Sequence, residues 1–322
     1  MTPPSSAVVE PLVERARAGD ARAVGRLISL VENASPLLRD VMAALMPYVG
    51  HARVVGLTGS PGVGKSTTTS ALLSAFRARD LRVGVLAVDP SSPFSGGALL
   101  GDRVRMQDHA TDSGVFIRSM ASRGHLGGLA WSTPQALRVL DAAGCDVVLV
   151  ETVGVGQAEV EVASLADSTL VLVAPGMGDA IQAAKAGILE IADIFVVNKA
   201  DRDGADQAAR DLRHMLSLGE RRTAGDWAPP VVKTVAARGE GIDDVVAALD
   251  KHHEWLVASG RLDAKRRVRA ADEIEAIAVT ALRERMGDLR GGSLLDELAG
   301  RVAGGDLDPY SAADTLLAGL TT

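Results

Sequence analysis

The stretch RVVGLTGSPGVGKST, residues 53–67, decides how the chain folds. Its second part matches the phosphate-binding loop pattern Gly-x-x-x-x-Gly-Lys-Ser, with Gly59, Gly64, Lys65 and Ser66 at the fixed positions. The valine-rich part before the loop predicts a buried strand, and the leucine and alanine spacing after it predicts a helix. Glycines allow backbone N–H groups to converge on phosphate oxygens at a helix N-terminus. This order of elements therefore predicts a site for the phosphates of a nucleotide.

The residues of this loop have separate expected tasks. Lys65 is expected to reach the β- and γ-phosphates, and the Ser66 hydroxyl is expected to bind Mg²⁺. A glycine turn that only joins a strand to a helix is the alternative, and the matching flanks disfavour it. The nucleotide-binding residues of the loop are Gly59, Ser60, Pro61, Gly62, Val63, Gly64, Lys65, Ser66 and Thr67.

The composition is that of a core-forming protein. The 322 residues are 47% hydrophobic but only 3% aromatic, so Val, Leu, Ile and Ala must build the core, as in parallel sheets covered by helices. The net charge of −7 disfavours nucleic acid as a partner. A single cysteine, Cys145, excludes an internal disulfide and fits a reducing compartment. We expect a soluble, cytoplasmic protein, because no signal pattern and no apolar run of the ~20 residues that a membrane span needs is present.

Seven short apolar stretches alternate with helical ones across the middle of the chain. This alternation predicts an α/β fold, a doubly wound and mostly parallel sheet whose ligands bind at the carboxyl ends of the strands. The expected strands are residues 53–58, 82–88, 114–119, 146–151, 168–174, 193–198 and 230–235.

Three parts are expected along the chain. Residues 1–50 form an N-terminal helical extension packed on the P-loop nucleotide domain, which spans residues 51–257. Residues 258–322 form a C-terminal helical arm, because they carry too few apolar residues per turn for a separate core. Docking or dimerisation is the expected role of this arm.

Acidic residues after the second strand are the first candidates for a metal site. Asp89 ends that strand, and Asp102 and Arg105 follow in the next loop. A Mg²⁺ ion on a nucleotide keeps several waters and takes one or two carboxylates, so both aspartates are candidates. A turn or helix-cap role is the alternative for Asp89, and the loop that carries Asp102 has no fixed position.

The fourth strand ends in Glu151-Thr152-Val153-Gly154, which resembles the Asp-x-x-Gly of G proteins. In that motif the carboxylate holds the metal shell and the glycine N–H senses the γ-phosphate. Glu151 is one methylene longer than Asp, so it acts through a water or positions the attacking one. Gln157 is close enough in sequence to orient water too, although it also fits an exposed helix start. The residue that positions the attacking water stays open among Glu151, Gln157 and Arg105.

The sixth strand ends in Asn198-Lys199-Ala200-Asp201, the Asn-Lys-x-Asp pattern of a guanine reader. Its aspartate accepts hydrogen bonds from the N1–H and the exocyclic amine of guanine, which adenine cannot donate in this way. The lysine stem lies along the base. This tetrapeptide predicts GTP and GDP as the ligands in place of ATP.

The seventh strand leads into Val235, Ala236 and Ala237, the usual place of a Ser-Ala-x loop whose backbone contacts the guanine oxygen. Valine replaces serine here, so a side-chain contribution is lost and a backbone contact remains. The histidines show no metal-ligand spacing, and we expect His252 and His253 at the surface and Cys145 in the core.

Taken in order, these motifs resemble the MeaB/ArgK family, the G proteins associated with adenosylcobalamin-dependent methylmalonyl-CoA mutase. The resemblance is strong over roughly residues 10–260 and looser at PFSGG and Val235. It is carried by the phosphate loop and by residues 88–106, 151–163, 176–193 and 198–201.

The resemblance implies a Mg²⁺-dependent GTPase that acts as a chaperone of this mutase or a related acyl-CoA mutase. It implies that slow GTP hydrolysis gates cofactor loading and protects the mutase, and that the protein is a homodimer through its C-terminal arm. Nucleotide-responsive switch loops would map to residues 89–105, 151–157 and 176–187, the last with Lys185.

Three other functions remain as alternatives. One is a P-loop kinase of the type once assigned to arginine and ornithine transport systems. Another is a nickel-delivery GTPase, which one cysteine and no histidine cluster disfavour. The third is a nucleotide sensor without hydrolysis. Because phosphoryl transfer depends mostly on positioning and charge stabilisation, we expect weak basal hydrolysis that rises when a partner orders the switch loops.

Overall fold

The computed structural model describes residues 6–90, 109, 111–122, 132–152, 158–176, 188–218, 225–286 and 293–320. The chain divides into two compact units, Met1–Arg266 and Arg267–Thr322. The first unit contains the sheet and all the site residues predicted from the sequence.

A seven-stranded sheet forms the centre of the first unit, with the strand order β3-β2-β4-β1-β5-β6-β7. Every pairing between these strands is parallel. Because β1 lies between β4 and β5, the phosphate loop leaves the sheet beside the carboxyl ends of both strands. The strands are β1 Arg53–Thr58, β2 Val83–Pro90, β3 Val115–Ser122, β4 Val147–Thr152, β5 Ser168–Val173, β6 Ile194–Val197 and β7 Val231–Lys233.

All seven predicted strands are confirmed, and the α/β fold with them. Valine and leucine are the main apolar residues of these strands, and the continuous burial of β4 and β5 is what a sheet covered on both faces requires. The last strand is shorter than predicted, because β7 lies at the edge of the sheet and its residues are only partly buried.

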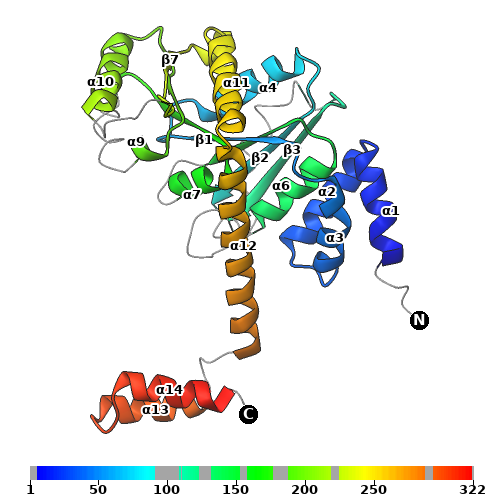
Figure 1. Ribbon diagram of the computed structural model, residues 1–322, viewed down its shortest axis with the longest axis vertical. Helices are drawn as coiled ribbons and strands as arrows, with labels where there is room; N and C mark the ends of the chain where they lie inside the picture. The colour runs from blue at the N-terminus through cyan, green and yellow to red at the C-terminus, as the bar shows by residue number, and fades with distance from the viewer. Residues whose placement is uncertain are drawn as a thin grey trace. The chain divides into compact units, whose positions relative to one another are not determined.

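Helices cover both faces of the sheet. Helices α4 (Lys65–Arg77) and α11 (Ile242–Ala258) lie on one side, and α6 (Thr133–Ala142) and α7 (Ala158–Leu165) lie on the other (Figure 1). Alternate strand residues face the two layers: Val55 packs in the cluster of α4 and α11, and Val54 packs in the cluster of α6 and α7. Two further helices, α9 (Ile188–Ile191) and α10 (Ala205–Leu218), follow β5 and β6 in the chain.

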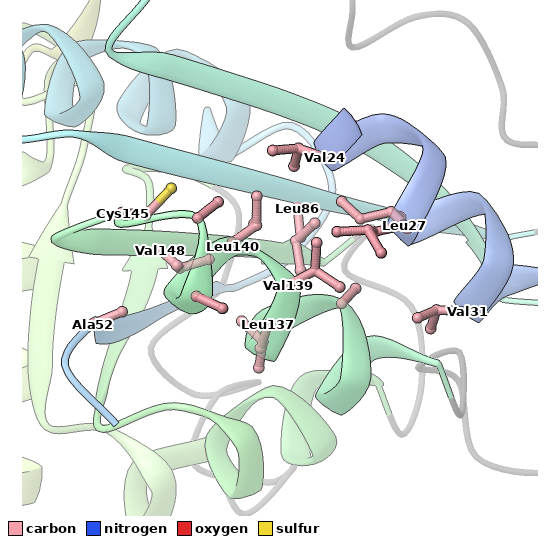
Figure 2. Close-up of a cluster of buried hydrophobic side chains, with 14 of the residues drawn as sticks. Val24, Leu27, Val31, Ala52, Leu86, Leu137, Val139, Leu140, Cys145 and Val148 are labelled. Atoms are coloured by element: carbon pink, nitrogen blue, oxygen red, sulfur yellow. The ribbon is translucent and has the colours of Figure 1, made fainter. Parts of the chain in front are cut away.

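The N-terminal helices share a core with the nucleotide domain. Figure 2 shows Leu27 of α2 close to Leu86 of β2 and Val139 of α6, and Val24 and Val31 of α2 belong to the same buried cluster. Full burial of one such leucine or valine contributes about 1.5–3 kcal/mol, so this contact fixes the extension to the domain. The N-terminal elements are α1 Ser6–Arg17, α2 Ala21–Glu32, α3 Leu38–Leu45 and the 3₁₀ helix η1 Met46–Tyr48.

The second unit is helical. It contains most of α12 (Arg261–Met286), followed by α13 (Ser293–Ala303) and α14 (Pro309–Leu320). Large apolar side chains of α12 are exposed, namely Val268, Ile274, Ile277, Val279 and Leu282. Within the part of the chain that the structure describes, no helix is long and apolar enough to cross a membrane.

Candidate nucleotide site

The phosphate loop follows β1 in a conformation that only glycine adopts easily. Gly59 has φ +139° and Gly64 has φ +99°, both in the left-handed half of the backbone map. A Cβ atom on Gly59 would lie 2.3 Å from the carbonyl oxygen of Leu172 in β5, and one on Gly64 would lie 2.4 Å from Nδ2 of Asn198. The loop is therefore pressed against the ends of β5 and β6, and its glycines are required for this close approach.

Lys65 is the first residue of α4, and its side chain is buried within the loop. Its Nζ atom donates hydrogen bonds to the carbonyl oxygens of Gly59, at 2.6 Å, and Ser60, at 3.2 Å. The ammonium group thus sits at the centre of the loop beside the N-terminus of α4, the place where anionic phosphate oxygens are best stabilised.

Glu151 reaches the same helix from the end of β4. Its side chain is 4% exposed, and its Oε1 accepts a hydrogen bond of 2.5 Å from the Ser66 hydroxyl. The Thr69 hydroxyl, one turn further along α4, lies 2.9 Å from Oε2. A carboxylate and hydroxyl oxygens are the donors that a hard cation such as Mg²⁺ prefers, so the residues present fit this ion.

Asn198 connects three segments of the site. Its Nδ2 donates to the carbonyl of Val63 in the phosphate loop, at 2.9 Å. Its Oδ1 accepts hydrogen bonds from the Thr234 hydroxyl and the Ala236 backbone N–H, both at 3.1 Å. Because this amide is buried, loss of any of these bonds would leave a polar group unpaired. The side chain therefore holds the phosphate loop, the end of β6 and the loop after β7 together.

Lys199 and Asp201 belong to the same tetrapeptide as Asn198. Lys199 has φ +56°, an uncommon value for a residue with a side chain, and such backbone strain is concentrated at functional sites. Its Nζ donates to the carbonyl of Gly62 at 2.6 Å, so it also contacts the phosphate loop. The Asp201 carboxylate is 43% exposed and lies 3.6 Å from the guanidinium of Arg238. It is therefore accessible to a base.

A groove of about 540 Å³ lies between α4 and the loop after β7. It extends from Ser66 and Thr67 in the phosphate loop to Ala236 and Ala237. This volume falls within the range of about 300–1,000 Å³ that is usual for small-molecule sites. The Val235 side chain is buried, and its backbone N–H donates to the carbonyl of Glu240 at 3.0 Å.

This geometry agrees with comparisons to known proteins. Residues 24–289 match the family model described as methylmalonyl-CoA mutase-associated GTPase MeaB. The chain belongs to the MeaB family. The predicted family is thereby confirmed, and so is the prediction that the protein is a GTPase and hence binds guanine nucleotides.

Relatives of this MeaB family member support the same assignment. A GTPase of Pyrococcus abyssi is 49% identical over 312 residues, which cover 96% of both chains. The GTPase ArgK of Escherichia coli is 39% identical over 275 residues, 83% of each chain. A crystal structure of an LAO/AO transport system kinase superposes with a TM-score of 0.74 and 29% identity, covering 98% of both chains.

Several predicted residues of the MeaB-type site lie outside the described residues, namely Asp102, Arg105, Gly154, Gln157 and Lys185. Asp89 lies in β2, whose register places Ala87 beside Glu151, but its side chain is not among those described. Thr69 and Arg238 were not predicted from the sequence. Helical spacing could have indicated Thr69, because it lies one turn after Ser66 on the same helix.

The expectation that His252 lies at the surface was wrong. His252 is 0% exposed and its Nδ1 lies 2.7 Å from the Ser168 hydroxyl, while its Nε2 lies 3.3 Å from an oxygen of Asp193. It is buried because it continues the inward face of α11, three residues after Leu249 and four before Leu256.

Charges close to His252 are arranged to keep Asp193 ionised. Burial alone would raise the pKa of Asp193, but the nearby imidazole of His252 and the charge of Lys265 outweigh burial and lower it. Cys145 is in the core as predicted, and burial raises its pKa to about 12, so its thiol is unreactive.

Among the described residues, no group of three or more His, Cys, Asp or Glu side chains is arranged to hold a metal ion.

Proposed function

We propose that this protein hydrolyses GTP to GDP and phosphate with Mg²⁺ and acts as a chaperone of an adenosylcobalamin-dependent methylmalonyl-CoA mutase or a related acyl-CoA mutase. The observation that carries the nucleotide part is the connection through Asn198, which holds the phosphate loop beside the base-reading segment. Phosphate binding and base reading are thereby built into one rigid edge of the sheet.

Each residue has a defined task in this proposal. Lys65 exchanges its contacts with loop carbonyls for contacts with the β- and γ-phosphates, and Asp201 accepts two hydrogen bonds from guanine. Ser66 and Glu151 would hold Mg²⁺, which supplies positive charge at the phosphates. Because Glu151 is buried against the hydroxyls of Ser66 and Thr69, we assign it to the metal site. Arg105 and Gln157 then remain the candidates for positioning the attacking water.

The mutase partner and the homodimer rest on the family and on the C-terminal arm. The family description names association with methylmalonyl-CoA mutase. A mouse relative, 40% identical over 214 residues, is named methylmalonic aciduria type A homolog, and the match spans 52% of that chain. The exposed apolar residues of α12 give the arm of residues 258–322 a surface suited to pairing with a second copy.

A transport-system kinase is the second candidate, because the solved relative with 29% identity is described as an LAO/AO transport system kinase. One experiment separates the two functions: hydrolysis of GTP and ATP with and without an adenosylcobalamin-dependent acyl-CoA mutase, for the unaltered protein and for Lys65→Ala and Asp201→Asn. We expect GTP-selective hydrolysis that the mutase stimulates, that Lys65→Ala abolishes and that loses guanine preference in Asp201→Asn. Equal use of ATP, or phosphorylation of a small molecule without any response to the mutase, would favour the kinase.

A further inference from the structure

Arg238 lies opposite the base-reading segment and joins two carboxylates. Its Nη2 is 3.6 Å from Oδ2 of Asp201, and its Nε is 2.9 Å from Oε1 of Glu240. Arg238 ends the short 3₁₀ helix η3, Ala236–Arg238, which follows β7. Glu240, in the same loop, thus holds the guanidinium of Arg238, while the guanidinium also pairs with Asp201, the residue expected to read guanine.

The loop that carries Arg238 is fixed by its own hydrogen bonds. The Val235 N–H donates to the carbonyl of Glu240 at 3.0 Å, and the Arg238 N–H donates to the carbonyl of Val235 at 2.8 Å. Gly241, at φ +75°, packs so closely on Lys233 that a Cβ would lie 2.2 Å from its carbonyl oxygen. Together with the bond from Asn198 to the loop, these contacts set the distance between Arg238 and Asp201.

We propose that Arg238 is a positioning residue for guanine recognition, which orients the Asp201 carboxylate toward the base. This inference rests on the proposed reading of guanine by Asp201. An exposed ion pair of this kind adds little to folding stability, so stabilisation of the fold does not explain the arrangement. Orientation of the Asp201 carboxylate explains the arrangement, because a carboxylate must be held in the plane of the base to accept two hydrogen bonds from it.

Charge supplies a second reason. When a base covers the half-exposed carboxylate of Asp201, water leaves it, and an uncompensated charge is costly in a dry site. The neighbouring guanidinium offsets that cost. Arginine suits this position better than lysine, because its planar group contacts Glu240 through Nε and Asp201 through Nη2 at the same time.

The test compares GDP, IDP and ADP binding to the full-length protein by titration calorimetry. IDP lacks the exocyclic amine of guanine, so it keeps the phosphate contacts and loses one hydrogen bond to Asp201. We expect Arg238→Ala to weaken GDP binding about tenfold, since the ion pair with Asp201 gains strength when the base covers it, and to weaken IDP binding less. The ratio of GDP to IDP affinity should fall several-fold, and Arg238→Lys should restore part of it.

Arg261→Ala is the matched control. Arg261 is 56% exposed, close to the 54% of Arg238, and it pairs with Asp226 at 3.0 Å. The substitution therefore removes a similar ion pair away from the site. Arg261→Ala should leave the ratio unchanged. In an Asp201→Asn background, Arg238→Ala should have no further effect on it, since the group that Arg238 positions is altered.

Two results would overturn the inference. One is a ratio within about twofold of the parent value in Arg238→Ala, and the other is an equal loss for GDP, IDP and ADP, which would indicate general damage. If the unaltered protein itself prefers GDP and Asp201→Asn removes that preference, guanine reading stands even when the inference on Arg238 fails. If the unaltered protein does not prefer GDP, both the proposed reading of guanine by Asp201 and the inference on Arg238 are refuted.

Discussion

Replacing His252 with alanine should destabilise the first unit without changing its nucleotide chemistry. His252 is fully buried and packs against both Trp227 and Trp255, with ring centroids 4.7 and 5.6 Å from its own, while the two indoles also contact each other at 5.8 Å. It contacts Ser168, the first residue of β5, and approaches Asp193, which precedes β6. These contacts lie at the amino edge of the sheet, and the residues proposed to bind the nucleotide lie at the carboxyl edge.

The expected loss in the free energy of unfolding has two parts. Removing the imidazole leaves the buried Ser168 hydroxyl without this partner, which costs about 1–3 kcal/mol. The space left beside the two indoles adds a cavity term, which for truncation of a large buried side chain brings the total to about 3 kcal/mol or more. For a unit of this size, each kcal/mol shifts the melting temperature by roughly 2–4 °C, so we expect a decrease of roughly 6–12 °C.

Thermal unfolding followed by tryptophan fluorescence measures this loss, because Trp227 and Trp255 both contact the substituted side chain. His253→Ala is the control, since His253 is the next residue of α11 but is only partly buried, and its melting temperature should fall by a few degrees at most. GTP hydrolysis well below the melting temperature should be unchanged in both variants. Equal shifts for His252→Ala and His253→Ala would refute the reasoning.

Three further predictions concern the site and the acid response. Gly64→Ala should weaken GDP binding more than tenfold in a titration, because its Cβ would displace the Asn198 amide, whereas Gly305→Ala, at φ +80° with open space around its Cβ, should leave binding intact. Asn198→Ala should lower the free energy of unfolding by about 2 kcal/mol in urea titrations and weaken GDP binding, since it leaves several backbone and hydroxyl groups unpaired. Burial, assisted by the charge of Arg53, lowers the pKa of His253 from 6.5, so His253 binds a proton less readily in the folded protein than in the unfolded chain. Stability should therefore fall as the pH drops below about 6.5, and urea titrations at pH 7.5 and 5.5 should show a smaller fall for His253→Gln.

Local patterns in the sequence predicted the elements and the motifs. The seven strands are runs of Val, Leu and Ile, and the phosphate loop and Asn198–Asp201 are contiguous motifs, so each could be found without knowledge of the rest of the chain. The bond from Asn198 to Val63 joins residues 135 positions apart, and no local pattern reports such a contact. The same holds for Arg238 and Asp201, which the register of β6 and β7 brings together.

His252 shows how a local pattern can mislead. The stretch DKHHEW reads as a polar surface of a helix, and two adjacent histidines look alike in composition. Helical spacing from Leu249 and Leu256 places only the first on the buried face, and a buried histidine is favourable only where partners such as Ser168 exist. Those partners come from another strand, so spacing alone could suggest burial but not justify it.

The two ends of β5 and β6 have different physical roles. At the carboxyl ends, Leu172 touches Gly59 and Asn198 holds the phosphate loop. At the amino ends, Lys265 near the start of α12 binds the carbonyl of Asp167 at 3.0 Å.

The next residue of α12 strengthens this attachment. Arg266 binds the Asp167 carboxylate at 3.1 Å and the carbonyls of Gly50 and Ala52. Because β5 and β6 are short and buried along their length, they connect the nucleotide edge to the first turns of α12 with little freedom to deform. A displacement of either strand would therefore reach Lys265 and Arg266 directly, because these side chains bind Asp167 and Asp193 just before the two strands.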